Sequence, residues 1–155
     1  MGLFSIKVAD ARNKFSASHF LVLGEGHKCS RLHGHNYTVN LSISGELNDN
    51  YFVVDFVEVK EKLQEIVEKF DHFVLVPTES DQIQVSIEEE EVRVQTPFKK
   101  FVFPKSDVCL LPLPATTSEL LAKHIFDLLK PDFPNYRLKV TVGETSTTTA
   151  IYEEE

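Results

Sequence analysis

The chain contains one stretch that decides its fold, CSRLHGHNYTVNLSISG at residues 29–45. From Tyr37 to Ile43 every second residue is apolar, and this alternation predicts a long β-strand that buries one face. His33 and His35 have the same parity, so both imidazoles should project from the buried side of the strand. A pair of polar rings at the end of an apolar row needs a polar partner or a bound ligand.

A third histidine lies on the strand predicted just before this one. His19 follows Phe15 and Ala17 at two-residue spacing, so it should also face inward. If the two strands pair as a hairpin, the three imidazoles converge. An isolated His-x-His pair is more often chance than a ligand set, but a third inward histidine favours a metal site. Three neutral imidazoles suit Zn²⁺ and leave its fourth position open, as in catalytic rather than structural zinc sites.

Hydrophobic periodicity predicts two helices. The first is capped by Asp55, with Glu58 as its capping-box partner, and the second runs from about Ser118 to Lys130 before Pro131. The apolar stripe of the first helix contains Phe56, Val59, Leu63, Ile66, Val67 and Phe70. Strands are expected over residues 4–8, 15–19, 37–45 and 138–144, with a short one at 51–54. This order predicts an α+β fold in which an antiparallel sheet carries both helices on one face.

The chain has 155 residues, the length of one domain, and it shows no internal repeat or linker. Residues 77–115 interrupt the predicted plan with further alternating runs at 83–87, 92–94 and 101–103. We interpret them as an extra hairpin or two within a single domain spanning residues 1–155. The acidic run Glu88–Glu91 is expected to be a solvated turn without a role in a site.

Composition excludes several classes of protein. The formal net charge is −8, whereas nucleic-acid binding needs basic patches. No stretch approaches the roughly 20 apolar residues of a membrane helix, and the N-terminus lacks the apolar run of a signal peptide. Two cysteines form no disulfide framework, so a reducing, cytoplasmic location is expected. A small anionic substrate would have to meet local cations, for which Lys14, Lys28 and Arg31 are candidates.

Two stretches, Phe15-Ser-Ala-Ser-His19 and Glu25-Gly-His-Lys-Cys29-Ser-Arg-Leu-His33-Gly-His35-Asn-Tyr37, resemble the 6-pyruvoyltetrahydropterin synthase / 6-carboxytetrahydropterin synthase family. Matching motifs follow in the expected order: Val54-Asp-Phe56, Asp71-His72, Thr117-Ser-Glu119 and Val140-Thr-Val-Gly-Glu144-Thr. The resemblance covers nearly the whole chain except about 77–115. It implies a tunnelling fold (T-fold) whose subunits join into a barrel. It also implies a homo-oligomer, a trimer or hexamer, with active sites at subunit interfaces.

The resemblance implies a role for each matched residue in acting on 7,8-dihydroneopterin triphosphate. Zinc would be bound by His19, His33 and His35, and no redox cofactor is needed. Cys29 would be the general base, with its thiolate favoured by a nearby cation. Asp71 and His72 would form a proton relay, although a histidine after a helix end is by pattern alone more often structural. Cys109 fits an inert buried thiol.

The same resemblance implies that four further residues bind the pterin ring: Glu144, Thr117, Ser118 and Glu119. Glu144 extends the apolar row of the last predicted strand, so it should point into a largely buried space, where a carboxylate needs partners. An amino-pyrimidine edge offers two adjacent N–H donors that one carboxylate can accept together. For Glu119 the run Thr116-x-x-Glu119 also fits a capping box, and both roles can hold.

Three residues separate Cys29 from His33, which resembles the 6-carboxytetrahydropterin synthase branch of deazaguanine (queuosine) biosynthesis. That branch releases acetaldehyde as well as triphosphate. The alternative is 6-pyruvoyltetrahydropterin synthase of the tetrahydrobiopterin pathway, whose animal members place the cysteine further upstream. A third branch uses a glutamate in place of the cysteine, and Glu25 lies close by. A non-catalytic pterin-binding protein is the rival of another class, which the combination of Cys29, Asp71 and His72 disfavours.

Overall fold

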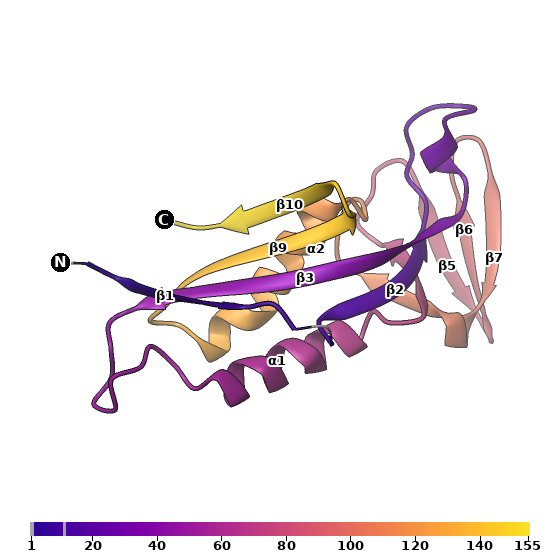
Figure 1. Ribbon diagram of the computed structural model, residues 1–155. Helices are drawn as coiled ribbons and strands as arrows, with labels where there is room; N and C mark the ends of the chain where they lie inside the picture. Colours follow the sequence, from indigo (N-terminus) through magenta and orange to yellow (C-terminus); the bar gives the residue numbers. More distant parts are fainter. Residues whose placement is uncertain (1, 11) are drawn as a thin grey trace. The chain divides into compact units, whose positions relative to one another are not determined.

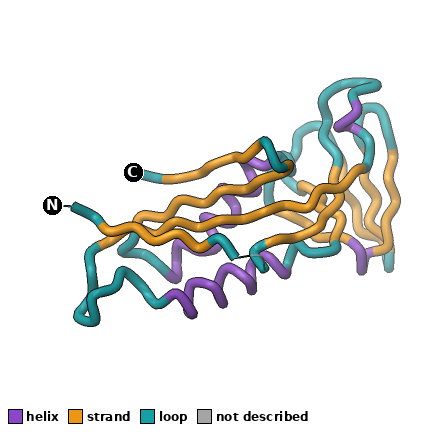
Figure 2. Tube along the Cα trace, in the orientation of Figure 1, coloured by secondary structure: helices purple, strands orange, loops and turns teal. Residues whose placement is uncertain are grey.

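The computed structural model describes residues 2–10 and 12–155, and the chain divides into two compact units. The first unit comprises residues 1–15, 36–69 and 118–155, and the second comprises residues 16–35 and 70–117. Figure 1 and Figure 2 show the course of the chain through its strands and helices. Each unit is described by itself. In the part of the chain that the structure describes, no helix is long and apolar enough to cross a membrane.

The first unit is built on an antiparallel sheet. Its strands are β1 (Phe4–Val8), β3 (His33–Gly45), β9 (Arg137–Thr145) and β10 (Thr148–Glu153), and the first three residues of β3 belong to the second unit. Strand β3 pairs with β1 on one side and β9 on the other, while β10 pairs with the far side of β9. Tyr37, Val39, Leu41 and Ile43 are fully buried, which confirms the alternation read from the sequence.

Both helices of the first unit cover one face of this sheet, as the sequence predicts (Figure 1). They are α1 (Phe56–Glu68) and α2 (Ser118–Leu129), and a short 3₁₀ turn, Lys130–Asp132, follows α2. The carboxylate of Asp55 caps α1 by accepting a hydrogen bond of 2.8 Å from the Val57 amide. The α1 stripe is buried from Val59 onward, but Phe56 is 53% exposed, so its assignment to the stripe was wrong.

The second unit contains a parallel set of strands that the sequence did not predict. Strand β2 (Lys14–His19), which enters this unit at Ser16, pairs in parallel with β4 (Phe73–Pro77), and β4 pairs in parallel with β8 (Val108–Leu111). A three-stranded antiparallel sheet follows β4 in the chain: β5 (Gln84–Glu88), β6 (Glu91–Gln95) and β7 (Lys100–Pro104). Its apolar side packs into a core cluster with Phe20, Val76 and Ile83.

Within residues 77–115, strands β5, β6 and β7 therefore form two hairpins, as the alternation predicts. The acidic run closes the β5–β6 hairpin, and the Arg93 guanidinium pairs with the carboxylates of Glu88 and Glu91 at 3.2 Å each. That this segment is an addition to the family fold stays a prediction.

One expectation about strands was wrong. Residues 51–54 form bends rather than a strand, and Tyr51 adopts a positive φ of 66°, outside the β region. Strand β1 forms as expected, with Phe4 exposed and only Val8, at its end, buried. Strand β10 was missed as well, because Thr148–Glu153 has little apolar character.

Candidate metal centre and active-site residues

The second unit brings together the three histidines that the sequence singled out. His19 ends β2 and is 1% exposed, while His33 and His35 open β3 and are partly buried. One ligand atom from each imidazole lies within 4.8 Å of the other two. The ring centroids are 4.7, 5.3 and 4.9 Å apart. The predicted convergence of the three rings is therefore confirmed.

Backbone carbonyls fix the orientation of two of the rings. The Nδ1 atom of His19 lies 3.0 Å from the Thr116 carbonyl oxygen and 3.1 Å from its hydroxyl. The Nδ1 atom of His33 lies 2.6 Å from the Arg31 carbonyl oxygen. Because a carbonyl only accepts, each Nδ1 must carry the proton and donate it, which leaves the Nε2 lone pair for a metal. In metal-binding histidines the ring nitrogen that does not bind the metal usually donates its proton to such an acceptor.

Glycine 34 allows the two strands to approach closely at this point. A Cβ atom on Gly34 would lie 3.2 Å from the Ala17 carbonyl oxygen, tighter than ordinary contact. The donor set, its spacing and its tautomers together fit a divalent ion such as Zn²⁺, which takes three imidazoles with one position open. His19, His33 and His35 are thus the residues that can hold a metal.

Cys29 lies on a 3₁₀ turn, Lys28–Ser30, in the loop between β2 and β3. Its thiol is partly exposed, its amide donates to His27 Nδ1 at 3.1 Å, and its carbonyl accepts from the Leu21 amide at 2.9 Å. Cys109 is also partly exposed, and burial raises the pKa of its thiol. A thiol that stays protonated fits the inert role expected for Cys109.

Asp71 and His72 form a direct pair in the turn just before β4. One Asp71 carboxylate oxygen accepts from the Ser16 amide at 2.8 Å, and the other lies 2.8 Å from His72 Nδ1. The hydrogen bond from the Ser16 amide, with a further contribution from His72, lowers the pKa of Asp71. His72 has a positive φ of 64°, and its amide donates to the Ser16 carbonyl at 2.7 Å. The loop thus holds an exposed imidazole in an uncommon backbone conformation, which is frequent at functional sites.

Three of the four residues assigned to the pterin ring line one cavity in the first unit. Ser118, Glu119 and Glu144 meet Thr148 and Thr149 of β10 around a volume of about 270 Å³. The Ser118 hydroxyl donates to a Glu144 carboxylate oxygen at 2.9 Å. Burial and the nearby charge of Glu144 raise the pKa of Tyr37. Glu144 itself is partly buried, less than the sequence indicated.

Thr117 belongs to the second unit and lines a different cavity there, with Leu23, Pro77 and Asp81. Sequence reasoning also missed the role of Thr116, whose hydroxyl and carbonyl contact His19. The run Thr116-x-x-Glu119 fits a helix cap, and no local pattern links Thr116 to a histidine 97 residues away. Thr148 and Thr149 were missed because β10 was not predicted.

Comparison with known proteins gives a consistent family. The profile described as 6-pyruvoyl tetrahydropterin synthase matches residues 9–155. A putative 6-carboxy-5,6,7,8-tetrahydropterin synthase from Methanocaldococcus jannaschii is 33% identical over 111 residues, which cover 70% of this chain and 66% of that protein. The chain thus spans slightly less than two thirds of such archaeal relatives. The 6-carboxy-5,6,7,8-tetrahydropterin synthase of Bacillus subtilis is 30% identical over 143 residues, covering 88% of this chain and 78% of the relative.

Among solved structures, a Plasmodium falciparum 6-pyruvoyl tetrahydropterin synthase aligns with a TM-score of 0.90 and 25% identity, covering 98% of both chains. The mixed α+β fold with two helices on an antiparallel sheet is therefore the fold of these synthases. The matched range includes the three histidines, Cys29, the Asp71–His72 pair and the Glu144 cavity.

Proposed function

The chain belongs to the 6-pyruvoyl tetrahydropterin synthase family, and from that premise we propose that it is a zinc-dependent lyase acting on 7,8-dihydroneopterin triphosphate with release of triphosphate. We further propose that it is a 6-carboxytetrahydropterin synthase, which also releases acetaldehyde. The observation that carries the proposal is the group of three imidazoles whose ligand atoms lie within 4.8 Å of one another. It supports an open metal site, which a lyase of this kind requires.

In this proposal His19, His33 and His35 hold the zinc ion. When bound, zinc supplies a Lewis acid that lowers the cost of removing a proton beside a substrate hydroxyl. The protein prepares these ligands beforehand, because the Thr116 and Arg31 carbonyls hold the Nδ1 protons of His19 and His33. Neither ring has to change its tautomer when the ion binds.

Cys29 is the proposed base that removes the substrate proton, and its partly exposed position allows a substrate to reach it. The Asp71–His72 pair is the proposed proton relay. The Asp71 carboxylate holds His72 Nδ1 and so leaves Nε2, at the exposed end of the ring, to accept or donate a proton. Because the Ser16 amide lowers the pKa of Asp71, its carboxylate stays charged and can stabilise the imidazolium.

Glu144 is the proposed anchor for the amino-pyrimidine edge of the pterin. The Ser118 hydroxyl occupies one lone pair of a Glu144 oxygen and so limits the rotation of the carboxylate. Both carboxylate oxygens then remain able to accept the two parallel N–H donors of the ring. Glu119 lines the same cavity and is the second candidate contact, and Thr117 stays a candidate from the family resemblance.

Two observations favour the 6-carboxy product. Three residues separate Cys29 from His33, and the curated relatives from M. jannaschii and B. subtilis bear the 6-carboxy name. The alternative, 6-pyruvoyltetrahydropterin synthase, is favoured by the alignment with the P. falciparum enzyme over nearly the whole of both chains. A pterin-binding protein without turnover is the alternative of another class, and the Asp71–His72 pair, which a binder does not need, argues against it.

The assembly and the location are proposed as well. We expect a homo-oligomer, a trimer or hexamer, acting in the cytoplasm without nucleic acid or membrane partners. The first unit exposes a group of apolar side chains that a second copy would cover: Tyr51, Phe52, Phe56 and Val57, which are 84%, 43%, 53% and 61% exposed. Light scattering coupled to size exclusion would give the number of subunits, and a monomer at micromolar concentration would contradict the expectation.

The function is tested by incubating the zinc-loaded protein with 7,8-dihydroneopterin triphosphate and identifying the products by mass spectrometry. Cys29→Ala is run beside it, with Cys109→Ala as the matched control. Acetaldehyde plus 6-carboxytetrahydropterin, lost only in Cys29→Ala, is the expected result. A 6-pyruvoyl product without acetaldehyde would assign the chain to the other branch. Tight pterin binding without turnover would overturn the enzyme proposal.

A further inference from the structure

We propose that Lys99, on the turn between β6 and β7, is a positioning residue that holds the loop carrying Cys29 in place. The inference rests on the proposed role of Cys29 as the base. It gives residues 77–115 a purpose, because they would supply a support for the active-site loop. The cysteine loop is defined here as residues 20–32, and the clamp turn as Thr96–Lys99.

The cysteine loop has little structure of its own. It contains one 3₁₀ turn, Lys28–Ser30, and two glycines with positive φ, Gly24 at 121° and Gly26 at 80°. The Ser30 hydroxyl makes only long bonds across the loop, 3.3 Å to the Gly24 carbonyl and 3.4 Å to the Leu23 amide. Backbone bonds close the loop, from the Leu21 amide to the Cys29 carbonyl at 2.9 Å and from the Ser30 amide to the His27 carbonyl at 3.0 Å, and a contact from another segment adds to these in fixing the position of Cys29.

The clamp turn, in contrast, is rigidly built. Thr96 is 7% exposed, its amide donates to the Lys99 carbonyl at 2.8 Å, and its hydroxyl accepts from the amides of Phe98 and Lys99 at 3.2 and 2.8 Å. The Gln95 side-chain amide donates to the carbonyls of Thr96 and Lys99 at 2.8 and 3.1 Å. The turn is thus fixed by five hydrogen bonds of its own.

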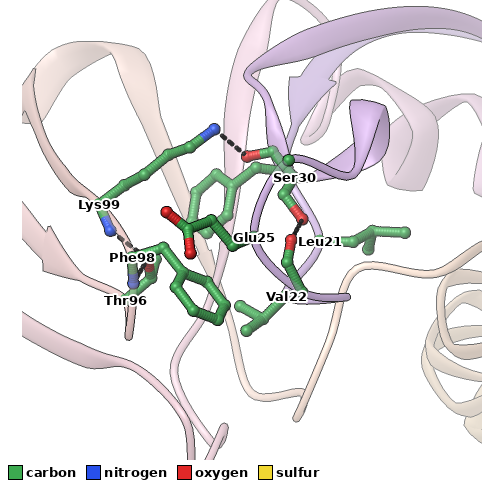
Figure 3. Close-up of a pocket in the computed structure, with 10 residues that line it drawn as sticks. Leu21, Val22, Glu25, Ser30, Thr96, Phe98 and Lys99 are labelled. Atoms are coloured by element: carbon green, nitrogen blue, oxygen red, sulfur yellow. Dashed lines mark hydrogen bonds between the residues drawn. The ribbon is translucent and has the colours of Figure 1, made fainter.

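The β6–β7 hairpin contacts the cysteine loop near both ends of the loop, at Phe20 and at Ser30. At the first end the ring of Phe101 on β7 stacks on Phe20, which directly follows His19, with 4.5 Å between the ring centroids. At the other end the Lys99 ammonium donates to the Ser30 carbonyl at 3.0 Å, in a partly buried hydrogen bond (Figure 3). Ser30 is the residue after Cys29, and the Cys29 carbonyl is held by the Leu21 amide at 2.9 Å. The two consecutive peptide units that follow Cys29 are therefore both held.

A cavity of about 120 Å³ lies between the clamp turn and the cysteine loop. Figure 3 shows the carboxylate of Glu25 directed into this space, between the side chains of Lys99 and Phe98. The cavity leaves this part of the loop without close packing. The hydrogen bond from Lys99 to Ser30 therefore connects the clamp turn to the loop across the cavity. A bond to a charged donor is stronger than a neutral one, which suits this role.

The test compares Lys99→Met, which keeps the stem but removes the donor, with Lys100→Met, an exposed neighbour on the same hairpin. In Lys99→Met we expect amide hydrogen exchange in residues 21–31 to quicken at least about fivefold. We expect kcat to fall about tenfold with KM within about twofold of the wild type, because a base displaced by about an ångström slows chemistry more than binding. Lys99→Arg, which keeps a charged donor, should restore both, and Lys100→Met should change neither.

Alkylation separates this proposal from the proposed function. In a Cys109→Ala background, the rate at which iodoacetamide alkylates Cys29 should change at least about threefold in Lys99→Met, whether or not Cys29 is catalytic. If Cys29→Ala keeps full activity, the proposed base is wrong, while exchange and alkylation still decide the role of Lys99. If Lys99→Met does not fold, the same exchange and alkylation measurements are made on Lys99→Gln, whose side chain is too short to reach Ser30. Wild-type exchange and alkylation in a folded variant would overturn the proposal.

Discussion

At the scale of single residues, the placement of protons explains how the histidine group is prepared for a metal. Thr116 is fully buried, and it offers His19 Nδ1 both a carbonyl and a hydroxyl oxygen. One N–H cannot satisfy both acceptors fully, so the hydroxyl can rotate and serve as a secondary contact. Arg31 supplies a single carbonyl to His33. Removing the Thr116 hydroxyl should therefore loosen the His19 ring without removing its main acceptor.

Thr116→Val should weaken zinc binding roughly tenfold, the lower end of the effect usual for lost outer-sphere partners. Competition with a chromogenic chelator measures the dissociation constant. The matched control is Thr78→Val, which removes a hydroxyl bond of 3.0 Å to the Leu111 carbonyl in the same unit. Equal zinc affinity in the Thr116 variant and the wild type would show that the carbonyl alone orients His19.

The carboxylate of Asp71 should make stability depend on pH at the acid end. Its pKa in the folded protein is lowered from 3.8, mainly by the Ser16 amide. A lowered pKa means that the charged form stabilises the fold above about pH 4 and that this contribution is lost as the pH falls through the folded pKa. Asp71→Ala should thus lose stability at pH 7, and its deficit relative to the wild type should shrink as the pH falls below 3.8, as judged by urea unfolding at each pH. Asp49→Ala is the control, and a difference that grows toward low pH would contradict this account.

At the scale of elements, the metal group depends on how closely β2 and the start of β3 approach. A methyl group on Gly34 would lie 3.2 Å from the Ala17 carbonyl oxygen, and a backbone atom cannot move aside as a side chain can. Gly34→Ala should shift the start of β3 by a few tenths of an ångström and weaken zinc binding about tenfold or more, measured by the same chelator competition. Gly143→Ala is the matched control, because its Cβ would meet atoms no closer than 3.6 Å. Similar affinity in both variants would show that the strands tolerate the added methyl.

The elements that could be predicted are those whose pattern is local. The β3 row from Tyr37 to Ile43 and helix α2 carry their own periodicity, and both form where it predicts. The parallel pairing of β4 with β2 and β8 could not be read, because it joins residues more than 30 positions apart. The strand predicted at residues 51–54 does not form. Val53 and Val54 are buried in succession, which is typical of bends packed on a core, whereas a strand would bury alternate residues.

The same distinction holds for the site. His33 and His35 could be recognised from parity on one strand, and His19 from the parity of the next. Thr116 and Lys99 could not, because their partners lie 97 and 69 residues away and nothing in the local sequence marks the contact. The roles of Cys29, Asp71 and Glu144 came from family motifs and stay predictions until variants are measured.

At the scale of the whole molecule, the chain assigns different tasks to its two units. All three candidate metal ligands, Cys29 and the Asp71–His72 pair belong to the second unit, whereas the cavity around Glu144 belongs to the first. The second unit also contains the cysteine loop, whose Ser30 carbonyl accepts a hydrogen bond from the Lys99 ammonium. A ligand that binds only the native state of one unit stabilises that unit first, because its binding energy is lost only when that unit opens.

Zinc should therefore protect the two units unequally. At a free zinc concentration of 100 times its dissociation constant, linkage gives about 2.7 kcal/mol, or roughly 100-fold slower exchange for amides exposed by opening the second unit. Amides of β9 and α2 in the first unit should change much less. Hydrogen exchange of zinc-loaded and chelator-treated protein measures both, and His33→Ala should show no response to zinc. Equal slowing in both units would mean that they open as one cooperative body, and it would overturn the prediction that the metal stabilises the second unit alone.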